Sequence, residues 1–211
     1  KEYKLLKREY FAIGTYTIPA GHVPNAIGKG VLLLSRDSEG NMEIISGYND
    51  IKNPTFLYWS KNNNRLYVST ENTDDTPGIY SFNINDFKEI QLIKSVNHSG
   101  RALCHINKNR NTLYSVSYND GCLYEYSIEK SDEITLNNKI NYSGSGPNKE
   151  RQESSHAHQV VFDKDENVYV CDLGSDKIWI HNPKNLQDLK SIDIPAGYGP
   201  RHMVIDQKNS Y

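Results

Sequence analysis

The chain has 211 residues, of which 36% are hydrophobic and 24% are charged, and its formal net charge is -2. This composition is typical of a soluble globular protein and excludes a disordered chain. The small negative charge gives no general attraction to nucleic acid or to an anionic membrane, so any positively charged site must be local.

The amino-terminal residues and the cysteines argue against export and against a disulfide framework. The segment KEYKLLKREY is charged where a signal peptide has an apolar core, and no run approaches eighteen apolar residues. Cys104, Cys122 and Cys171 lie far apart and form no C-x-x-C pair, which predicts buried free thiols. We therefore predict a cytoplasmic protein that binds no membrane and no nucleic acid.

Short runs rich in Ile, Val and Tyr alternate with clusters of Asn, Asp, Gly and Ser, which favours strands over helices. The opening YFAIGTYT from Tyr10 matches the second strand of a partial unit. Three later segments then repeat an apolar strand, a polar turn and a second strand, and they begin at Thr55, Ala102 and His158. A fourth copy begins at Arg201.

Each repeat continues into a third, alternating strand, and these strands are predicted to begin at Gly30, Gly78, Gly121 and Asp176. The predicted turns lie at Ser60, Asn107, Asp163 and Asp206, at intervals of 47, 56 and 43 residues. Periods of about 40 to 50 residues with four short strands each are typical of propeller blades. We therefore predict an all-β fold, a β-propeller of four-stranded antiparallel blades with about four of seven blades present.

The domain organisation follows from the repeats. We expect residues 1–211 to form a single β-propeller domain that is incomplete at its carboxyl terminus, because the last repeat stops within its turn. A propeller closes only when its last blade packs against its first. We expect the chain alone to aggregate, or to need the missing carboxyl-terminal blades or another chain to close the ring.

The segment GSGPNKERQESSHAH, from Gly144 to His158, is the densest in chemically active groups. Its two histidines are two residues apart, so both side chains point to the same side if the segment is extended. The repeat frame places His158 level with Arg201, and Arg151 over the same channel mouth. These positions predict a cationic funnel made of Arg151, Arg201, His156, His158 and His202.

Structural alternatives exist for the same residues. The two histidines could hydrogen-bond to neighbouring blades, or they could hold a metal with Asp172 or His202 as a further ligand. Each arginine could pair with an acidic neighbour such as Asp172 or Asp176. We predict that no metal and no cofactor is bound.

Several motifs occur in one order along the chain, namely IGTYT, NPTFL, LYVSTE, SYNDG, GPNKERQESSHAH, DLGSDKI and GYGPRH. In these motifs the chain resembles the seven-bladed propeller lactonases, which include a bacterial type of 6-phosphogluconolactonase and the fungal carboxymuconate cyclases. The resemblance implies a cofactor-free lactone hydrolase of the pentose phosphate pathway whose substrate is a small anionic sugar lactone. The alternatives are a carboxymuconate-type lactonising cyclase and a non-catalytic propeller that binds a partner or a sugar ligand.

The chain also departs from that family. Ala102 and Leu103 stand where a polar residue is usual, and Ser117 stands in place of an asparagine. A glutamate of the blade that follows GPRH would lie beyond Tyr211. His105 falls inside a strand of the repeat frame, so we do not count it as catalytic.

Lactone hydrolysis needs an activated water, stabilisation of the oxyanion and a proton for the leaving ring oxygen. Given the resemblance, we expect His156 or His158 to act as general base and Arg201 to stabilise the oxyanion, with His202 as a reserve acid. We expect Arg151 to bind the anionic group of the substrate. The other expected substrate-binding residues are Gln152, Asp172, Tyr118 and Glu71.

Overall fold

The computed structural model describes residues 8–74, 76, 78–97, 100–206 and 208. Their regular structure consists of fifteen β-strands and one 3-10 turn, η1 (Lys61–Asn63). The strands form four antiparallel sheets in chain order, which confirms the predicted all-β class and the blade architecture. Within these described residues, no helix is both long enough and apolar enough to cross a membrane.

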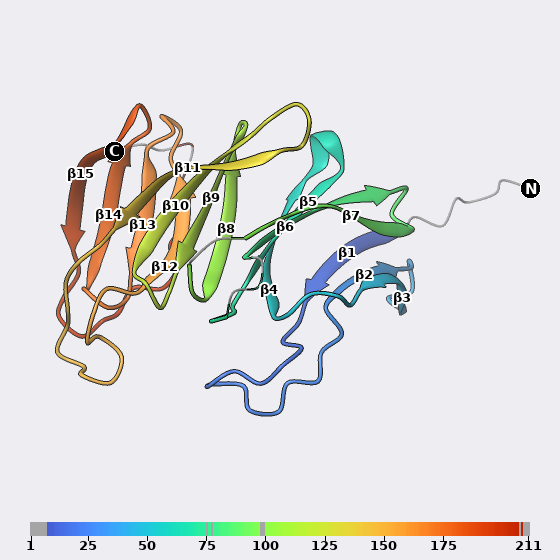
Figure 1. Cartoon of the computed structure of the whole chain (residues 1–211), viewed down its shortest axis with the longest axis horizontal. Helices are drawn as coiled ribbons and strands as arrows, with labels where there is room; N and C mark the ends of the chain where they lie inside the picture. Colours follow the sequence, from blue (N-terminus) through green and yellow to red (C-terminus); the bar gives the residue numbers. More distant parts are fainter. Residues whose placement is uncertain (1–7, 75, 77, 98–99, 207, 209–211) are drawn as a thin grey trace, which may run out of the picture.

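Figure 1 shows the four sheets side by side, with the first at one end of the molecule and the fourth at the other. The first sheet has the order β1 (Glu9–Gly14), β2 (Val31–Arg36) and β3 (Met42–Tyr48). The second contains β4 (Pro54–Ser60), β5 (Arg65–Thr70), β6 (Ile79–Asn85) and β7 (Glu89–Val96). The third contains β8 (Leu103–Asn109), β9 (Thr112–Ser117), β10 (Cys122–Ile128) and β11 (Ile134–Asn141). The fourth contains β12 (Ala157–Phe162), β13 (Val168–Asp172), β14 (Lys177–Asn182) and β15 (Asn185–Asp193).

The first sheet differs from the others in having three strands. Within the described residues β1 hydrogen-bonds to β2 alone, so it takes the place that β5, β9 and β13 have in their sheets. This confirms the prediction that the opening segment is the second strand of a partial unit. In the predicted fourth repeat, residues 201–206 form no strand, and residues 207 and 209–211 lie outside the described part of the chain.

Three apolar clusters lie between neighbouring sheets. Val31 of the first sheet packs with Val68 and Phe82 of the second, and Tyr67 of the second packs with Leu103 of the third. A further cluster joins the third and fourth sheets. The strands β5 and β9 are buried along almost their whole length, because both faces of each sheet are covered.

A β-bulge recurs near the start of β4, β8 and β12, where the pairing register shifts by one residue. The residues that the pairing skips are Thr55, Cys104 and His158. A bulge bends its strand and redirects a side chain, and bulges are common beside active sites. The three skipped residues are therefore equivalent positions in three successive blades.

The bulges also correct one predicted turn. The prediction of a turn at Asn107 is wrong. The turn between β8 and β9 lies at Arg110, which has a left-handed φ of 51°. Asn107 lies within β8 and its side-chain amide donates to the carbonyl of Val160, 3.0 Å away. This hydrogen bond joins the inner strands of the third and fourth sheets.

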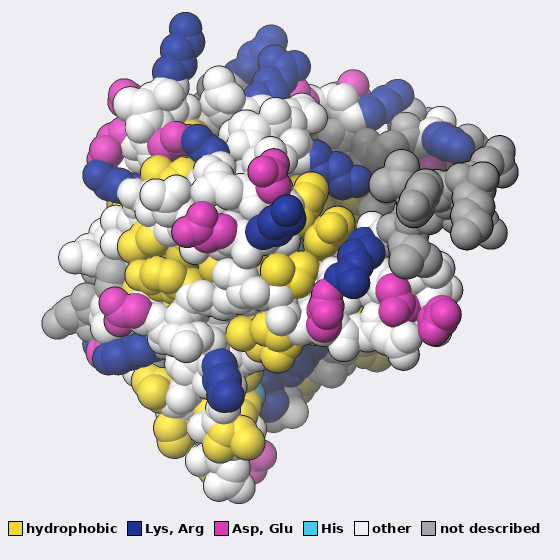
Figure 2. Space-filling view, turned by 90° about the vertical axis from the view of Figure 1, so that its right-hand side faces the viewer, with side chains coloured by type: hydrophobic (Ala, Val, Ile, Leu, Met, Phe, Trp, Pro, Cys, Tyr) yellow, Lys and Arg dark blue, Asp and Glu magenta, His cyan; other side chains and the backbone are white. Residues whose placement is uncertain are grey.

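Figure 2 views the molecule from the side of the first sheet and shows hydrophobic side chains in several patches between charged residues. Large apolar side chains exposed on strands of this sheet are Tyr10, Phe11, Ile13, Met42 and Ile44. The first sheet therefore presents apolar surface to solvent, unlike the sheet faces between neighbouring blades.

Candidate active site

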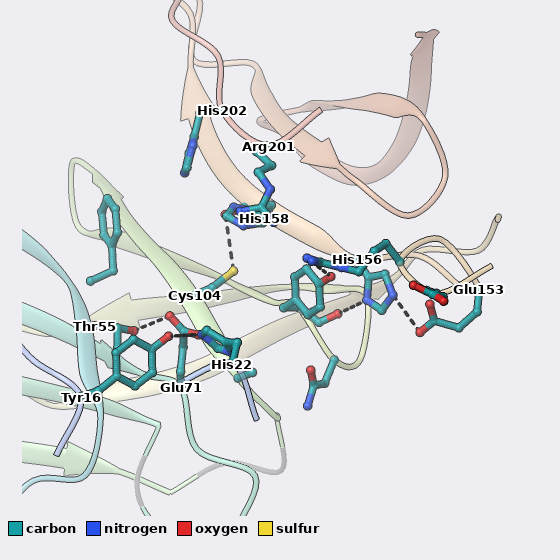
Figure 3. A pocket seen from close by; sticks show the side chains of 16 residues that line it. Tyr16, His22, Thr55, Glu71, Cys104, Glu153, His156, His158, Arg201 and His202 are labelled. Atoms are coloured by element: carbon teal, nitrogen blue, oxygen red, sulfur yellow. Dashed lines mark hydrogen bonds and ion pairs between the residues drawn. The ribbon is translucent and has the colours of Figure 1, made fainter. Parts of the chain in front are cut away.

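A cavity of about 700 Å³ opens where the inner strands β4, β8 and β12 begin, and Figure 3 shows the side chains around it. All three bulge residues, Thr55, Cys104 and His158, line it. It also brings together seven of the nine residues that the sequence predicts for the site, namely Glu71, Tyr118, Arg151, His156, His158, Arg201 and His202. All five residues of the predicted cationic funnel therefore line this one cavity.

His156 is held by hydrogen bonds at both ring nitrogens. Its Nδ1 lies 2.8 Å from the carbonyl of Tyr118, and its Nε2 lies 2.9 Å from a carboxylate oxygen of Glu153. The ring also stacks on Tyr118 at 4.3 Å, and only 5% of the residue is exposed. Because both ring nitrogens already face oxygen atoms of the protein, neither is open to a water in the cavity, and His156 is better suited to a structural role.

His158 has different surroundings. The bulge places its ring in the cavity, and its Nδ1 has no hydrogen-bond partner among the residues that the structure describes. Burial, reinforced by His202 and Arg201, lowers the pKa of His158 to about 4. The ring is therefore neutral near pH 7 and can accept a proton. Of the two predicted bases, the geometry favours His158.

His202 and the two arginines stand around His158. The rings of His158 and His202 meet edge to face at 4.9 Å, and Arg201 lines the cavity beside them in Figure 3. A guanidinium nitrogen of Arg151 donates to the hydroxyl of Tyr118 at 3.1 Å. In the described part of the chain neither arginine forms an ion pair, so both charges are available to an anionic ligand.

Asp172, one of the expected substrate-binding residues, does not line the cavity. It is fully buried and its carboxylate accepts six hydrogen bonds, from the backbone or side chains of Ser155, His156, Gly174, Ser175 and Trp179. Its two carboxylate oxygens accept these hydrogen bonds from the crossover, residues 142–156 between β11 and β12, and from residues in and after the turn that follows β13. Asp172 thus fixes the backbone that leads into β12.

Gln152 is also placed away from the cavity, and it is 2% exposed. Its amide nitrogen donates to the carbonyl of Leu173 at 2.9 Å and to Asp176 at 2.8 Å. Asp176 in turn accepts hydrogen bonds from the backbone of Gly197 and Gly199. These contacts tie the crossover to the segment that carries Arg201, and they occupy the carboxylate that was a possible partner of an arginine.

The structure adds a group of side chains that the sequence did not indicate. Tyr16 donates from its hydroxyl to Glu71 at 2.7 Å, and Thr55 donates to the other oxygen of Glu71 at 2.7 Å. His22 lies 2.8 Å from the hydroxyl of Tyr16. Tyr16 belongs to the motif IGTYT and Thr55 to the motif NPTFL, which were the available signals, whereas nothing in the sequence marked His22.

Among the described residues, no three His, Cys, Asp or Glu side chains come close enough together to hold a metal ion. The chemistry that the cavity can perform with its own side chains is proton transfer by a neutral histidine, together with charge stabilisation by two arginines.

The repeated antiparallel blades, with a polar cavity at the mouth of their inner strands, define a β-propeller with a small-molecule site. Residues 10–211 match the model of the family described as "Lactonase, 7-bladed beta-propeller". The chain therefore belongs to this lactonase family.

Individual relatives agree with this assignment. The chain is 29% identical to the 6-phosphogluconolactonase of Bacillus subtilis over 168 residues, which cover 75% of the chain and 47% of that protein. It is also 29% identical to the 6-phosphogluconolactonase of Formosa agariphila over 185 residues, covering 82% of the chain and 52% of that protein. The chain thus spans about half the length of the curated relatives it matches. These names support a lactone hydrolase.

Solved structures share the fold. A Lactobacillus plantarum protein superimposes with a TM-score of 0.79 at 26% identity, over 93% of the chain and 56% of that protein. A periplasmic gluconolactonase from Pseudomonas aeruginosa gives a TM-score of 0.75 at 20% identity, over 93% of the chain and 58% of that protein. At this identity the second likeness concerns the fold alone.

Proposed function

We propose that the complete protein hydrolyses a sugar-phosphate lactone of the 6-phosphogluconolactone type to its open acid. The observation that carries this proposal is the position of His158, whose bulged side chain lines the same cavity as two arginines that form no ion pair among the described residues. The names of the relatives supply the lactone class. The arginines supply the reason for an anionic substrate, because a guanidinium binds phosphate through paired hydrogen bonds.

In the proposed reaction, water attacks the lactone carbonyl while His158 takes its proton. Arg201, beside that ring, stabilises the negative charge that develops on the carbonyl oxygen. The bond between the carbonyl carbon and the ring oxygen then breaks, and His158 returns the proton that it took from water to the departing oxygen, with His202 as the reserve acid. Arg151, held by Tyr118, binds the phosphate. His156 keeps Tyr118 in place through the stacked rings.

The proposal extends to the setting of the protein. We propose a role in carbohydrate metabolism, in the pentose phosphate pathway of the cytoplasm, and completion of the ring by further blades or another chain. Its support is the relatives' names and, for the ring, the seven blades in the description of the family.

The experiment is a steady-state assay of the intact native protein with 6-phosphoglucono-δ-lactone. We expect His158→Gln to lower kcat by about 10²–10⁴-fold, because the proton acceptor is lost. Arg201→Gln should lower kcat by about 10²–10³-fold. Arg110→Gln is the matched control, since Arg110 is exposed in the turn after β8 and pairs with Glu166.

Thermal unfolding of every variant separates chemistry from folding. Loss of activity with an unchanged Tm supports the assigned roles. The proposal is wrong if the native protein does not accelerate hydrolysis above the spontaneous rate, or if Arg110→Gln is as damaging as Arg201→Gln.

A further inference from the structure

The cavity has two chemically different walls, and the proposed reaction uses only one. Figure 3 shows Arg201, His202 and His158 on one side and Tyr16, His22, Thr55 and Glu71 on the other, with Cys104 between them. We call the group formed by Tyr16, His22, Thr55 and Glu71 the acceptor wall. Among the described residues, no cation pairs with Glu71.

The hydroxyl hydrogen atoms of the acceptor wall point at other atoms of the wall and not at the cavity. A carboxylate only accepts hydrogen bonds, so the hydroxyl protons of Tyr16 and Thr55 both point at Glu71. The hydroxyl of Tyr16 has no second proton, so in its contact with His22 the ring Nε2 must be the donor. The atoms left for a ligand are therefore acceptors, namely the remaining lone pairs of Glu71 and the oxygen of Thr55.

The wall is also built rigidly. Asn53 accepts hydrogen bonds from the backbone amides of Thr17 and Ile18, at 2.9 and 3.0 Å, which fixes the segment directly after Tyr16. Thr55 sits on the bulge of β4 and Glu71 directly follows β5, so both come from paired strands. A site whose polar atoms are held in place before binding discriminates well between ligands.

We propose that the acceptor wall determines specificity by binding hydroxyl groups of the substrate, so that the site selects a polyhydroxylated lactone over one without ring hydroxyls. Ligand hydroxyls donate to Glu71 and Thr55, while the anionic group lies at the arginines on the other side. An unhydroxylated, carboxylate-bearing lactone offers no donor to this wall and leaves these half-buried acceptors without a partner on the ligand. This inference rests on the proposed lactonase function and names the class of lactone.

The test compares two substrates that differ only in ring hydroxyls, 6-phosphoglucono-δ-lactone and its 2,3,4-trideoxy analogue, in the intact native protein. We expect the native protein to favour the hydroxylated lactone in kcat/KM by about 10²-fold or more. Glu71→Gln keeps the shape but replaces an acceptor with a donor. It should lower kcat/KM about 10–100-fold for the hydroxylated lactone, mainly through KM, and less than about 3-fold for the analogue.

Tyr16→Phe is the positioning variant, since it leaves Glu71 in place and removes one bond that orients it. It should give a smaller loss in the same direction. Glu133→Gln is the matched control, because Glu133 is exposed and pairs with Lys94 away from the cavity. Equal losses for both lactones in Glu71→Gln, with an unchanged Tm, would overturn the proposal, and so would no loss for either.

A binding measurement keeps this inference separate from the proposed function. If the native protein hydrolyses neither lactone, the proposed function has failed, and calorimetry with 6-phosphogluconate and its 2,3,4-trideoxy analogue decides the role of the wall. Tighter binding of the hydroxylated acid that is abolished by Glu71→Gln supports the acceptor wall. Equal binding of the two acids refutes it.

Discussion

His156 and His158 show how two residues of the same type, two positions apart, acquire different chemistry. His156 precedes β12 and is enclosed by Tyr118 and Glu153, whereas His158 occupies the bulge and enters the cavity. The alternation of an extended segment predicts that both side chains share one side. The bulge changes that alternation, which is why the sequence left the choice of base open.

A third histidine, His105, gives a prediction for stability. Burial, aided by His202 and His158, lowers the pKa of His105 to about 3, and its Nδ1 accepts a weak hydrogen bond from the amide of Val160 at 3.4 Å. The unfolded chain binds a proton at this residue near pH 6.5 and the folded chain does not. The free energy of unfolding should therefore be greatest above pH 6.5 and fall as the pH is lowered toward 3. At pH 4 the loss due to His105 should be at most about 3 kcal/mol.

The measurement is Tm as a function of pH for the native protein and for His105→Gln, because Gln159 occupies the equivalent position of the next blade. The variant should lose less Tm than the native protein between pH 7 and pH 4. Parallel curves would show that His105 does not contribute to acid sensitivity.

Individual residues also show the limit of reading the site from sequence. Motifs and repeat spacing predicted Arg151, Arg201 and His158 at one channel mouth, and all three line the cavity. Asp172 was expected there too, because spacing along a strand does not distinguish a side chain facing the channel from one facing the next loop. His22 was missed because it lies before the first complete repeat, where there is no equivalent residue to align.

At the scale of elements, the inner and central strands were predictable and the outer strands were not. The strands β5 and β9 each carry an aliphatic-Tyr pair and are buried from that pair to their last residue, because neighbouring sheets cover both faces. The outer strands β11 and β15 are largely exposed, and each pairs through an irregular register with its neighbour. Exposed, irregular strands have weak apolar alternation, so their sequences gave no clear signal.

The crossover between the third and fourth sheets depends on close backbone contact at Gly174. A Cβ atom added there would lie 1.8 Å from the carbonyl oxygen of Ser154. We expect Gly174→Ala to destabilise the fold by about 1–3 kcal/mol, because the crossover must move away. Gly21→Ala is the control, since an added Cβ meets nothing within 4 Å.

Denaturant titration of both variants measures the effect. The expected result is a lower midpoint for Gly174→Ala and a change within about 0.5 kcal/mol for Gly21→Ala. An unchanged midpoint for Gly174→Ala would mean that the crossover is not held as tightly as the contact distances imply.

At the scale of the whole molecule, association is predicted by the edge of β1, which no described strand pairs, and by the exposed apolar side chains of the first sheet. Unpaired strand edges and exposed apolar patches are the usual starting points of strand-to-strand association. We expect the 211-residue chain on its own to elute above its mass of 24.1 kDa, with a concentration dependence in light scattering.

A matched pair of variants tests the role of the edge. Ile13→Lys places a charge on β1, where Ile13 is 42% exposed, and should reduce association. Ile27→Lys changes a residue that is 90% exposed but lies outside the strands, and should have little effect. A chain that remains monomeric at about 100 μM, or an equal effect of the two substitutions, would contradict the prediction.

The recurring bulge has a consequence for how such a protein can diversify. At Thr55, Cys104 and His158 the side chain enters the cavity from a residue that the strand pairing skips. Selection can therefore change what this residue does without changing the pairing of the blade. A library randomised at these three positions alone should retain a high proportion of folded members while sampling different reactivities, which makes the bulges natural starting points for directed evolution.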